Sequence, residues 1–150
     1  MGTKRDLTGT IEKHRVIGLD TSVFIYQFEG KRYPELTGAV FEAIERGHCR
    51  AVVSVISLME VLVMPLRKGD ARLASMYRSV FESMPNLLMV NVTPVIAQKA
   101  AGIRAEFNLS TPDSILLATT IDNGSGLFIT NEPRLKRVET IEVAVLDEYA

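Results

Sequence analysis

Four acidic residues, Asp20, Glu60, Asp113 and Glu132, stand beside apolar segments rather than among other charged side chains. Carboxylates gathered at one place would repel one another and raise each other's pKa values unless a cation neutralised them. A set of oxygen ligands without histidine or thiol suits Mg²⁺ or Mn²⁺ better than zinc. Such cations commonly serve displacement at phosphorus, where the metal activates water and offsets charge on the phosphate.

Each acid also has an interpretation that needs no function. Asp20 can cap the helix that follows it. Glu60 can close a capping box, Ser57-x-x-Glu60, at the start of its helix. Asp113 and Glu132 can be first-turn acids that the helix dipole favours. The chemical interpretation therefore depends on elements that bring the four acids to one place.

The pattern of apolar residues predicts an α/β domain with three layers. Five short runs, rich in β-branched residues, have the length of strands that are buried on both faces, which is typical of parallel sheets. Longer amphipathic stretches between them predict helices, and this alternation indicates helices on both faces of the sheet. The predicted strands are 16–19, 51–55, 87–92, 127–129 and 141–146, and the predicted helices are 22–28, 34–46, 56–66, 70–83, 94–107 and 112–123.

Helix starts place the acids at one rim of this sheet. Thr111 has the type of an N-cap, Pro112 of a first helical residue, and Asp113 then lies in the first turn. Ligands of such sheets bind at the carboxyl ends of the strands. Asp20 and Glu132 follow predicted strands, while Glu60 and Asp113 belong to helices that start at the same rim.

Length and composition exclude several classes of protein. With 150 residues the chain has the size of one domain, predicted at 16–150 behind a loose extension at 1–15. The balance of 17 basic and 18 acidic residues excludes binding of nucleic acid by bulk positive charge. A single cysteine, Cys49, excludes an internal disulfide and a multi-cysteine zinc site. Because no apolar stretch has the length of a membrane span or the form of a signal peptide, we expect a cytoplasmic protein.

Four segments, in order and at matching spacing, resemble PIN-domain ribonucleases, especially the VapC-type toxins of prokaryotic toxin–antitoxin systems. They are VIGLDTSVFIY at 16–26, SVISLMEV at 54–61, LSTPDSILLAT at 109–119 and LFITNE at 127–132. The resemblance covers residues 16–147 and implies a five-stranded parallel sheet with an acidic Mg²⁺ or Mn²⁺ site. By this likeness Asp20, Glu60 and Asp113 occupy the three best-kept acidic positions. Glu132 stands where the family usually has aspartate, which keeps the charge and adds a methylene group.

The resemblance also implies roles for neighbouring residues. Hydroxyl and amide groups would orient carboxylates or phosphate, and these groups belong to Thr21, Ser22, Thr130 and Asn131. The hydroxyls have an equally good interpretation as helix caps. Substrate phosphates would be held by Arg134, Arg67 and Lys68, which can also be parts of solvated helix faces.

The function implied is metal-dependent hydrolysis of phosphodiester bonds in single-stranded RNA. Asp20, Asp113 and Glu132 would hold one or two ions, with Glu60 as a ligand or water-orienting base. A second copy of the chain and a small antitoxin are the expected protein partners.

Three other functions are consistent with parts of the sequence. A PIN domain without catalysis could bind RNA or act as a scaffold, and Glu132 is the feature that favours this alternative. A phosphatase with Asp20 as nucleophile is disfavoured because Ser22 stands where a second aspartate is expected. A dinucleotide-binding dehydrogenase is disfavoured because no Gly-x-Gly-x-x-Gly follows the first strand.

Overall fold

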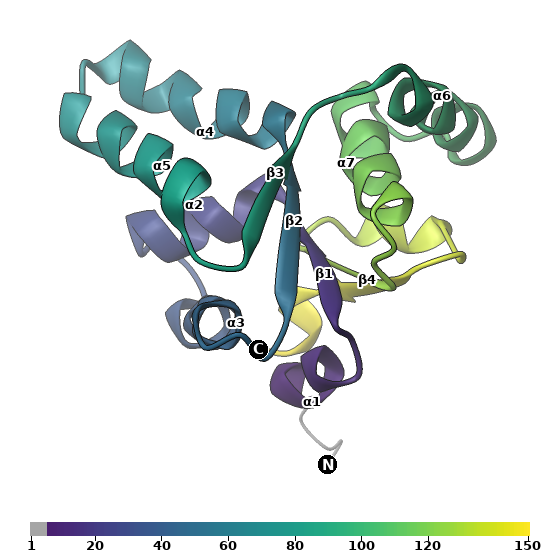
Figure 1. The fold of residues 1–150 in the computed structure, drawn as a ribbon, viewed down its shortest axis with the longest axis horizontal. Coiled ribbons are helices and arrows are strands. Elements are labelled where there is room, and N and C mark those ends of the chain that lie inside the picture. Colours follow the sequence, from purple (N-terminus) through teal and green to yellow (C-terminus); the bar gives the residue numbers. More distant parts are fainter. Residues whose placement is uncertain (1–5) are drawn as a thin grey trace.

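The structure is a computed structural model that describes residues 6–150. Helices and strands alternate along this part of the chain (Figure 1). Their order is α1 (Leu7–Glu12), β1 (Val16–Leu19), α2 (Thr21–Glu29), α3 (Pro34–Glu45), β2 (Arg50–Ser54), α4 (Val55–Lys68), α5 (Ala71–Ser83), β3 (Leu87–Val90), α6 (Pro94–Phe107), α7 (Thr111–Asp122), β4 (Leu127–Thr130), the 3₁₀ helix η1 (Pro133–Arg137), β5 (Glu142–Val145) and the 3₁₀ helix η2 (Leu146–Glu148).

The five strands form one parallel sheet in the order β3-β2-β1-β4-β5. Strand β1 is central, with Gly18 paired to Val52 of β2 on one side and to Phe128 of β4 on the other. The prediction of an α/β fold with a five-stranded parallel sheet is confirmed. Because all strands point the same way, the residues that follow β1, β2 and β4 meet at one edge of the sheet.

Helices cover both faces of the sheet, which confirms the three layers. One core contains Ile17 and Leu19 of β1 together with buried residues of α1 to α5. On the other face, Phe128 of β4 packs with Leu117 of α7, and α6 joins α7 through Ile96. Figure 1 shows α2 to α5 on one side of the sheet and α6 and α7 on the other.

Gly18 allows α7 to lie very close to the central strand. A Cβ atom at this position would lie 2.2 Å from the Oγ1 atom of Thr120, closer than any real contact. Since α7 leads into β4, which is parallel to β1, α7 runs opposite to the strands. Its first turn, with Asp113, therefore lies at the carboxyl edge of the sheet.

Two parts of the fold differ from the sequence-based expectations. Strand β3 forms an edge of the sheet and its Leu88 is 57% exposed, so the expectation of burial on both faces is wrong for this strand. Residues 1–15 were expected to form a loose extension. Residues 1–5 lie outside the described part, while residues 7–12 form α1, whose Leu7 and Ile11 are buried in the core. None of the helices in residues 6–150 is long and apolar enough to cross a membrane.

Candidate active site

Asp20 lies at the carboxyl end of β1 and is only 8% exposed. It is the N-cap of α2, and its Oδ1 atom accepts a hydrogen bond of 2.7 Å from the backbone N–H of Thr21. Its Oδ2 atom accepts a bond of 2.6 Å from the hydroxyl of Thr130. The capping interpretation of Asp20 is therefore confirmed, but it accounts for only one of the two carboxylate oxygens.

Thr130 ends β4, the neighbour of β1, and is completely buried. The pairing of Leu19 with Ile129 places Thr130 beside Asp20. Besides donating to Asp20, the Thr130 hydroxyl accepts a 3.0 Å hydrogen bond from the backbone N–H of Glu132. One hydroxyl thus joins Asp20 to the loop that carries Glu132.

Glu60 lies in α4 and accepts a hydrogen bond from a residue of α2. The helix starts at Val55 with Ser54 as its N-cap, so the capping-box interpretation of Ser57 and Glu60 is wrong. Instead, the Thr21 hydroxyl donates a 2.7 Å hydrogen bond to Oε1 of Glu60 and lies 2.9 Å from the hydroxyl of Ser57. Because Thr21 has one hydroxyl proton, which it gives to Glu60, Ser57 must donate to Thr21.

This chain of hydrogen bonds includes a residue that the sequence analysis did not assign to the site. Ser57 is fully buried, one helical turn before Glu60 and on the same side of α4. A buried serine three positions before an acid on an apolar helix is the signal that could have found it. Oε1 of Glu60 is therefore held by the Thr21 hydroxyl, which is itself held by the hydroxyl of Ser57.

Asp113 lies in the first turn of α7, where the helix dipole favours a negative charge. The N-cap is Ser110, whose Oγ atom accepts from the N–H of Asp113 at 3.2 Å. The expected cap, Thr111, is instead the first residue of the helix. The dipole interpretation is confirmed, and the charge of Asp113 also raises the pKa of Asp20.

The pKa of Asp20 is raised from its usual 3.8 to about 6. Burial is the largest cause, and the charges of Asp113 and Glu60 raise the pKa further. The hydrogen bonds from Thr130 and from the N–H of Thr21 act in the opposite direction. Asp20 is thus a buried acid with two other acids close enough to repel its charge.

Glu132 has a different partner. It is the N-cap of η1, and both of its carboxylate oxygens accept hydrogen bonds from Arg134. These bonds lower the pKa of Glu132. The charges of Glu60 and Asp113 thus act on Asp20, whereas Glu132 is tied to Arg134.

The other predicted residues lie around this group. Arg67 and Lys68 are exposed in the last turn of α4, and Arg67 is seven residues beyond Glu60, about 10 Å along the same face. Asn131 accepts from the N–H of Asp147 in η2 at 2.9 Å and donates to the hydroxyl of Tyr26 in α2 at 3.2 Å. Its Nδ2 atom also donates to Oδ1 of Asp147 at 3.4 Å, so Asn131 holds the loop after β4, and its side chain forms no hydrogen bond with the four predicted acids.

The donor set fits a hard cation such as Mg²⁺ or Mn²⁺. Asp20, Glu60 and Asp113 offer oxygen atoms only, and a positive ion would offset the repulsion that raises the pKa of Asp20. The enclosed hydroxyl of Ser22, next to Thr21, has no hydrogen-bond partner in the described chain. As they stand, no three or more His, Cys, Asp or Glu side chains of residues 6–150 form a group that could hold a metal ion.

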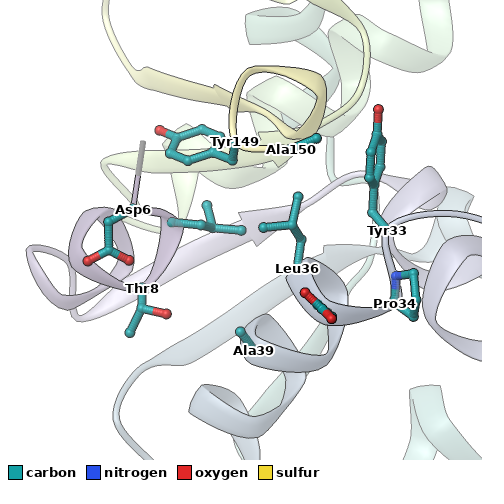
Figure 2. Close-up of a pocket in the computed structure, with 10 residues that line it drawn as sticks. Asp6, Thr8, Tyr33, Pro34, Leu36, Ala39, Tyr149 and Ala150 are labelled. Carbon is teal, nitrogen blue, oxygen red and sulfur yellow. The ribbon is translucent and has the colours of Figure 1, made fainter. Parts of the chain in front are cut away.

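A cavity of about 560 Å³ lies elsewhere, between α1, the start of α3 and the C-terminal residues (Figure 2). Figure 2 shows Tyr33 and Tyr149 at its wall, with Leu36 between them. None of the predicted site residues lines this cavity. The candidate site is therefore an open edge of the sheet rather than this pocket.

Comparison with known proteins agrees with the fold. The PIN domain profile matches residues 17–141. Among solved structures, VapBC2 from Rickettsia felis, bound to a DNA fragment from its promoter, is similar with a TM-score of 0.70 and 14% identity, covering 87% of this chain and 98% of that chain. A toxin–antitoxin complex from Klebsiella pneumoniae is similar with a TM-score of 0.64 and 22% identity, covering 83% and 94%.

A third similar structure is VapC20 from Mycobacterium tuberculosis, described as a toxin that cleaves the sarcin–ricin loop, with a TM-score of 0.62 and 16% identity. It covers 75% of this chain and 86% of that chain. Among curated protein sequences, none matches this chain. Because the family profile spans most of the chain, from β1 to the start of β5, the chain belongs to the PIN domain family.

Proposed function

We propose that this chain is a metal-dependent endoribonuclease that hydrolyses phosphodiester bonds in single-stranded RNA, and that it acts in the cytoplasm as the toxin of a toxin–antitoxin pair. The observation that carries the proposal is a buried aspartate, Asp20, with two further acids beside it at the carboxyl edge of a PIN domain. The similar structures include toxin–antitoxin complexes and a toxin that cleaves the sarcin–ricin loop, which supports the same class of activity.

In this proposal Asp20, Glu60 and Asp113 hold Mg²⁺ or Mn²⁺. The bound ion would supply activation of a water molecule and neutralisation of charge on the scissile phosphate. Thr130 fixes Asp20, and Thr21 fixes Glu60 through one oxygen, which leaves the other oxygen of Glu60 free. The enclosed hydroxyl of Ser22, beside Thr21, has no hydrogen-bond partner in the described chain and can still donate one hydrogen bond.

Basic side chains near this edge would bind the RNA backbone. Arg134 follows β4 by four residues, and Arg67 and Lys68 lie farther out on α4. A flexible single strand can follow an open edge with scattered cations, whereas a duplex adapts its backbone less easily. RNA binding is therefore expected to weaken as the salt concentration rises.

The surface of α4 supports a protein partner. Met59, Val63 and Leu66 are exposed at i, i+4 and i+7, which forms an apolar stripe next to Glu60. A small antitoxin that covers this stripe would also cover the edge of the acidic site. Contact with a second copy of the chain remains a prediction from the family resemblance.

The experiment that tests the function compares cleavage of a labelled single-stranded RNA pool by the wild type and by Asp20→Asn, after removal of any copurifying inhibitor. Each protein is assayed with Mg²⁺, with Mn²⁺ and with EDTA. Asp70→Asn is the matched control because Asp70 also caps a helix, α5, but is exposed. We expect cleavage that needs the metal and Asp20 and does not need Asp70.

Absence of cleavage with either metal, from folded and partner-free wild type, would contradict the proposal. If that protein still bound RNA, the chain would be a binding module or scaffold instead. Fluorescence anisotropy with the same RNA in EDTA measures this binding directly.

A further inference from the structure

Glu132 and Arg134 form a compact pair in the loop after β4. Oε1 of Glu132 accepts hydrogen bonds from the backbone N–H of Arg134 at 3.0 Å and from its Nε at 2.9 Å. Oε2 accepts from Nη2 of Arg134 at 3.3 Å. Both oxygens of the carboxylate are therefore used, and the guanidinium is held along one side.

The pair is fixed relative to the candidate active site. The N–H of Glu132 donates to the Thr130 hydroxyl, which itself donates to Asp20. Pro133 restricts the backbone between the two members of the pair, and the next residue, Leu135, is fully buried. The loop is thus anchored at both ends, and the direction of the Arg134 side chain is set by Glu132.

The guanidinium of Arg134 is largely exposed to solvent in the loop after β4. The hydrogen bonding and charge of Glu132 and, to a smaller extent, the charge of Asp113 raise the pKa of Arg134. The side chain of Arg134 is 66% exposed, whereas that of Glu132 is 31% exposed. Of the five N–H donors of the guanidinium, those that do not bind Glu132 remain available to a ligand at the edge of the site.

Stabilisation of the fold does not explain this arrangement, because ion pairs between exposed side chains contribute little to stability. Preorganisation for binding explains the arrangement, because a guanidinium that is already held in place loses less conformational freedom when it binds a phosphate. On the basis of the proposed function, we propose that Glu132 is a positioning residue that directs the guanidinium of Arg134 toward an RNA phosphate, rather than a ligand of the metal. The extra methylene of glutamate gives its carboxylate the reach to hold the guanidinium from the side.

The test separates metal binding from RNA binding. Mn²⁺ affinity is measured by electron paramagnetic resonance of the free ion, and RNA affinity by anisotropy of a labelled single-stranded RNA in EDTA. The variants are Glu132→Gln, Glu132→Asp, Arg134→Gln and the double variant Glu132→Gln/Arg134→Gln. Lys136→Gln, another basic residue of η1, is the control for the loss of one positive charge.

We expect Arg134→Gln to weaken RNA binding about tenfold, Glu132→Gln and Glu132→Asp to weaken it about threefold or more, and the double variant to equal Arg134→Gln. Mn²⁺ affinity is expected to stay within about twofold in all of them, and Lys136→Gln to have little effect on either affinity. In the cleavage assay the loss is expected in KM rather than in kcat.

Three results would each overturn the inference. One is a tenfold loss of Mn²⁺ affinity in Glu132→Gln, as expected of a metal ligand. Another is tighter RNA binding by Glu132→Gln, as expected if Glu132 only neutralises Arg134. The third is a loss of RNA affinity in the double variant that equals the product of the losses in the two single variants. Because these affinities need no cleavage, failure of the proposed nuclease activity would be seen separately from failure of this inference.

Discussion

Replacing Asp20 with asparagine is expected to stabilise the metal-free protein at neutral and higher pH, although it removes a residue central to the proposed chemistry. Asparagine keeps the cap of α2, since its side-chain oxygen can still accept from the N–H of Thr21. Its amide group can donate to the hydroxyl of Thr130, which has acceptor capacity. What the substitution removes is a buried negative charge.

The magnitude follows from the pKa of Asp20, which rises from 3.8 to about 6 on folding. A group whose pKa is higher in the folded protein holds its proton more tightly there, so its contribution to stability is lost as pH rises through about 6. At about 1.4 kcal/mol for each pKa unit, the ionised Asp20 costs about 3 kcal/mol at pH 8 and about half of that at pH 5. For a protein of this size, 3 kcal/mol corresponds to roughly 6–12 °C in Tm.

Urea unfolding in EDTA at pH 5 and pH 8 measures this difference between Asp20→Asn and the wild type. Asp70→Asn is the control, because substitution of an exposed cap by another good cap changes stability by roughly 0.5 kcal/mol or less. The difference between Asp20→Asn and wild type is expected to grow by about 1.4 kcal/mol from pH 5 to pH 8. An equal difference at both pH values would refute the reasoning, because burial of a charge could then not be its cause.

Three further outcomes are expected. Millimolar Mg²⁺ raises the Tm of the wild type at pH 8 but not that of Asp20→Asn in scanning fluorimetry, and an equal rise in both would place the ion elsewhere. Thr21→Val weakens Mn²⁺ binding about tenfold while Thr21→Ser retains it, as measured by calorimetry; equal binding by both would deny Thr21 a role in holding the metal ligand. Gly18→Ala lowers the unfolding free energy by about 3 kcal/mol, because the added methyl group meets Thr120. Gly38 has open space around it, so Gly38→Ala leaves the unfolding free energy unchanged or raises it by up to about 1 kcal/mol. Similar losses in both variants would contradict the close packing at Gly18.

The fold was predictable because burial leaves a strong pattern in the sequence. Strand β1 was expected at the bounds that the structure shows, since an apolar run between charged residues has one simple explanation. The exposure of β3 was harder to predict, because this edge strand has the same apolar residues as a buried strand although Leu88 faces solvent. Helix α1 contributes only Leu7 and Ile11 to the core, too few to form a recognisable period.

The site was predictable to the extent that it depends on the ends of strands. Asp20 and Thr130 follow directly from the parallel arrangement of β1 and β4. The hydrogen bond between Ser57 and Thr21 could not be predicted in this way, because the two residues are 36 positions apart and local spacing favoured a capping box. The pairing of Glu132 with Arg134 depends on the turn of η1, whose geometry cannot be read from residue types alone.

The hydrogen bond between Thr130 and Asp20 joins residues that are 110 positions apart. During translation, at roughly 5–20 residues per second, Asp20 leaves the ribosome roughly 5–20 s before Thr130 does. Until β4 has docked on β1, the growing polypeptide lacks the hydroxyl that holds its central acid. The candidate site is therefore complete only after β4 has been synthesised and has docked on β1.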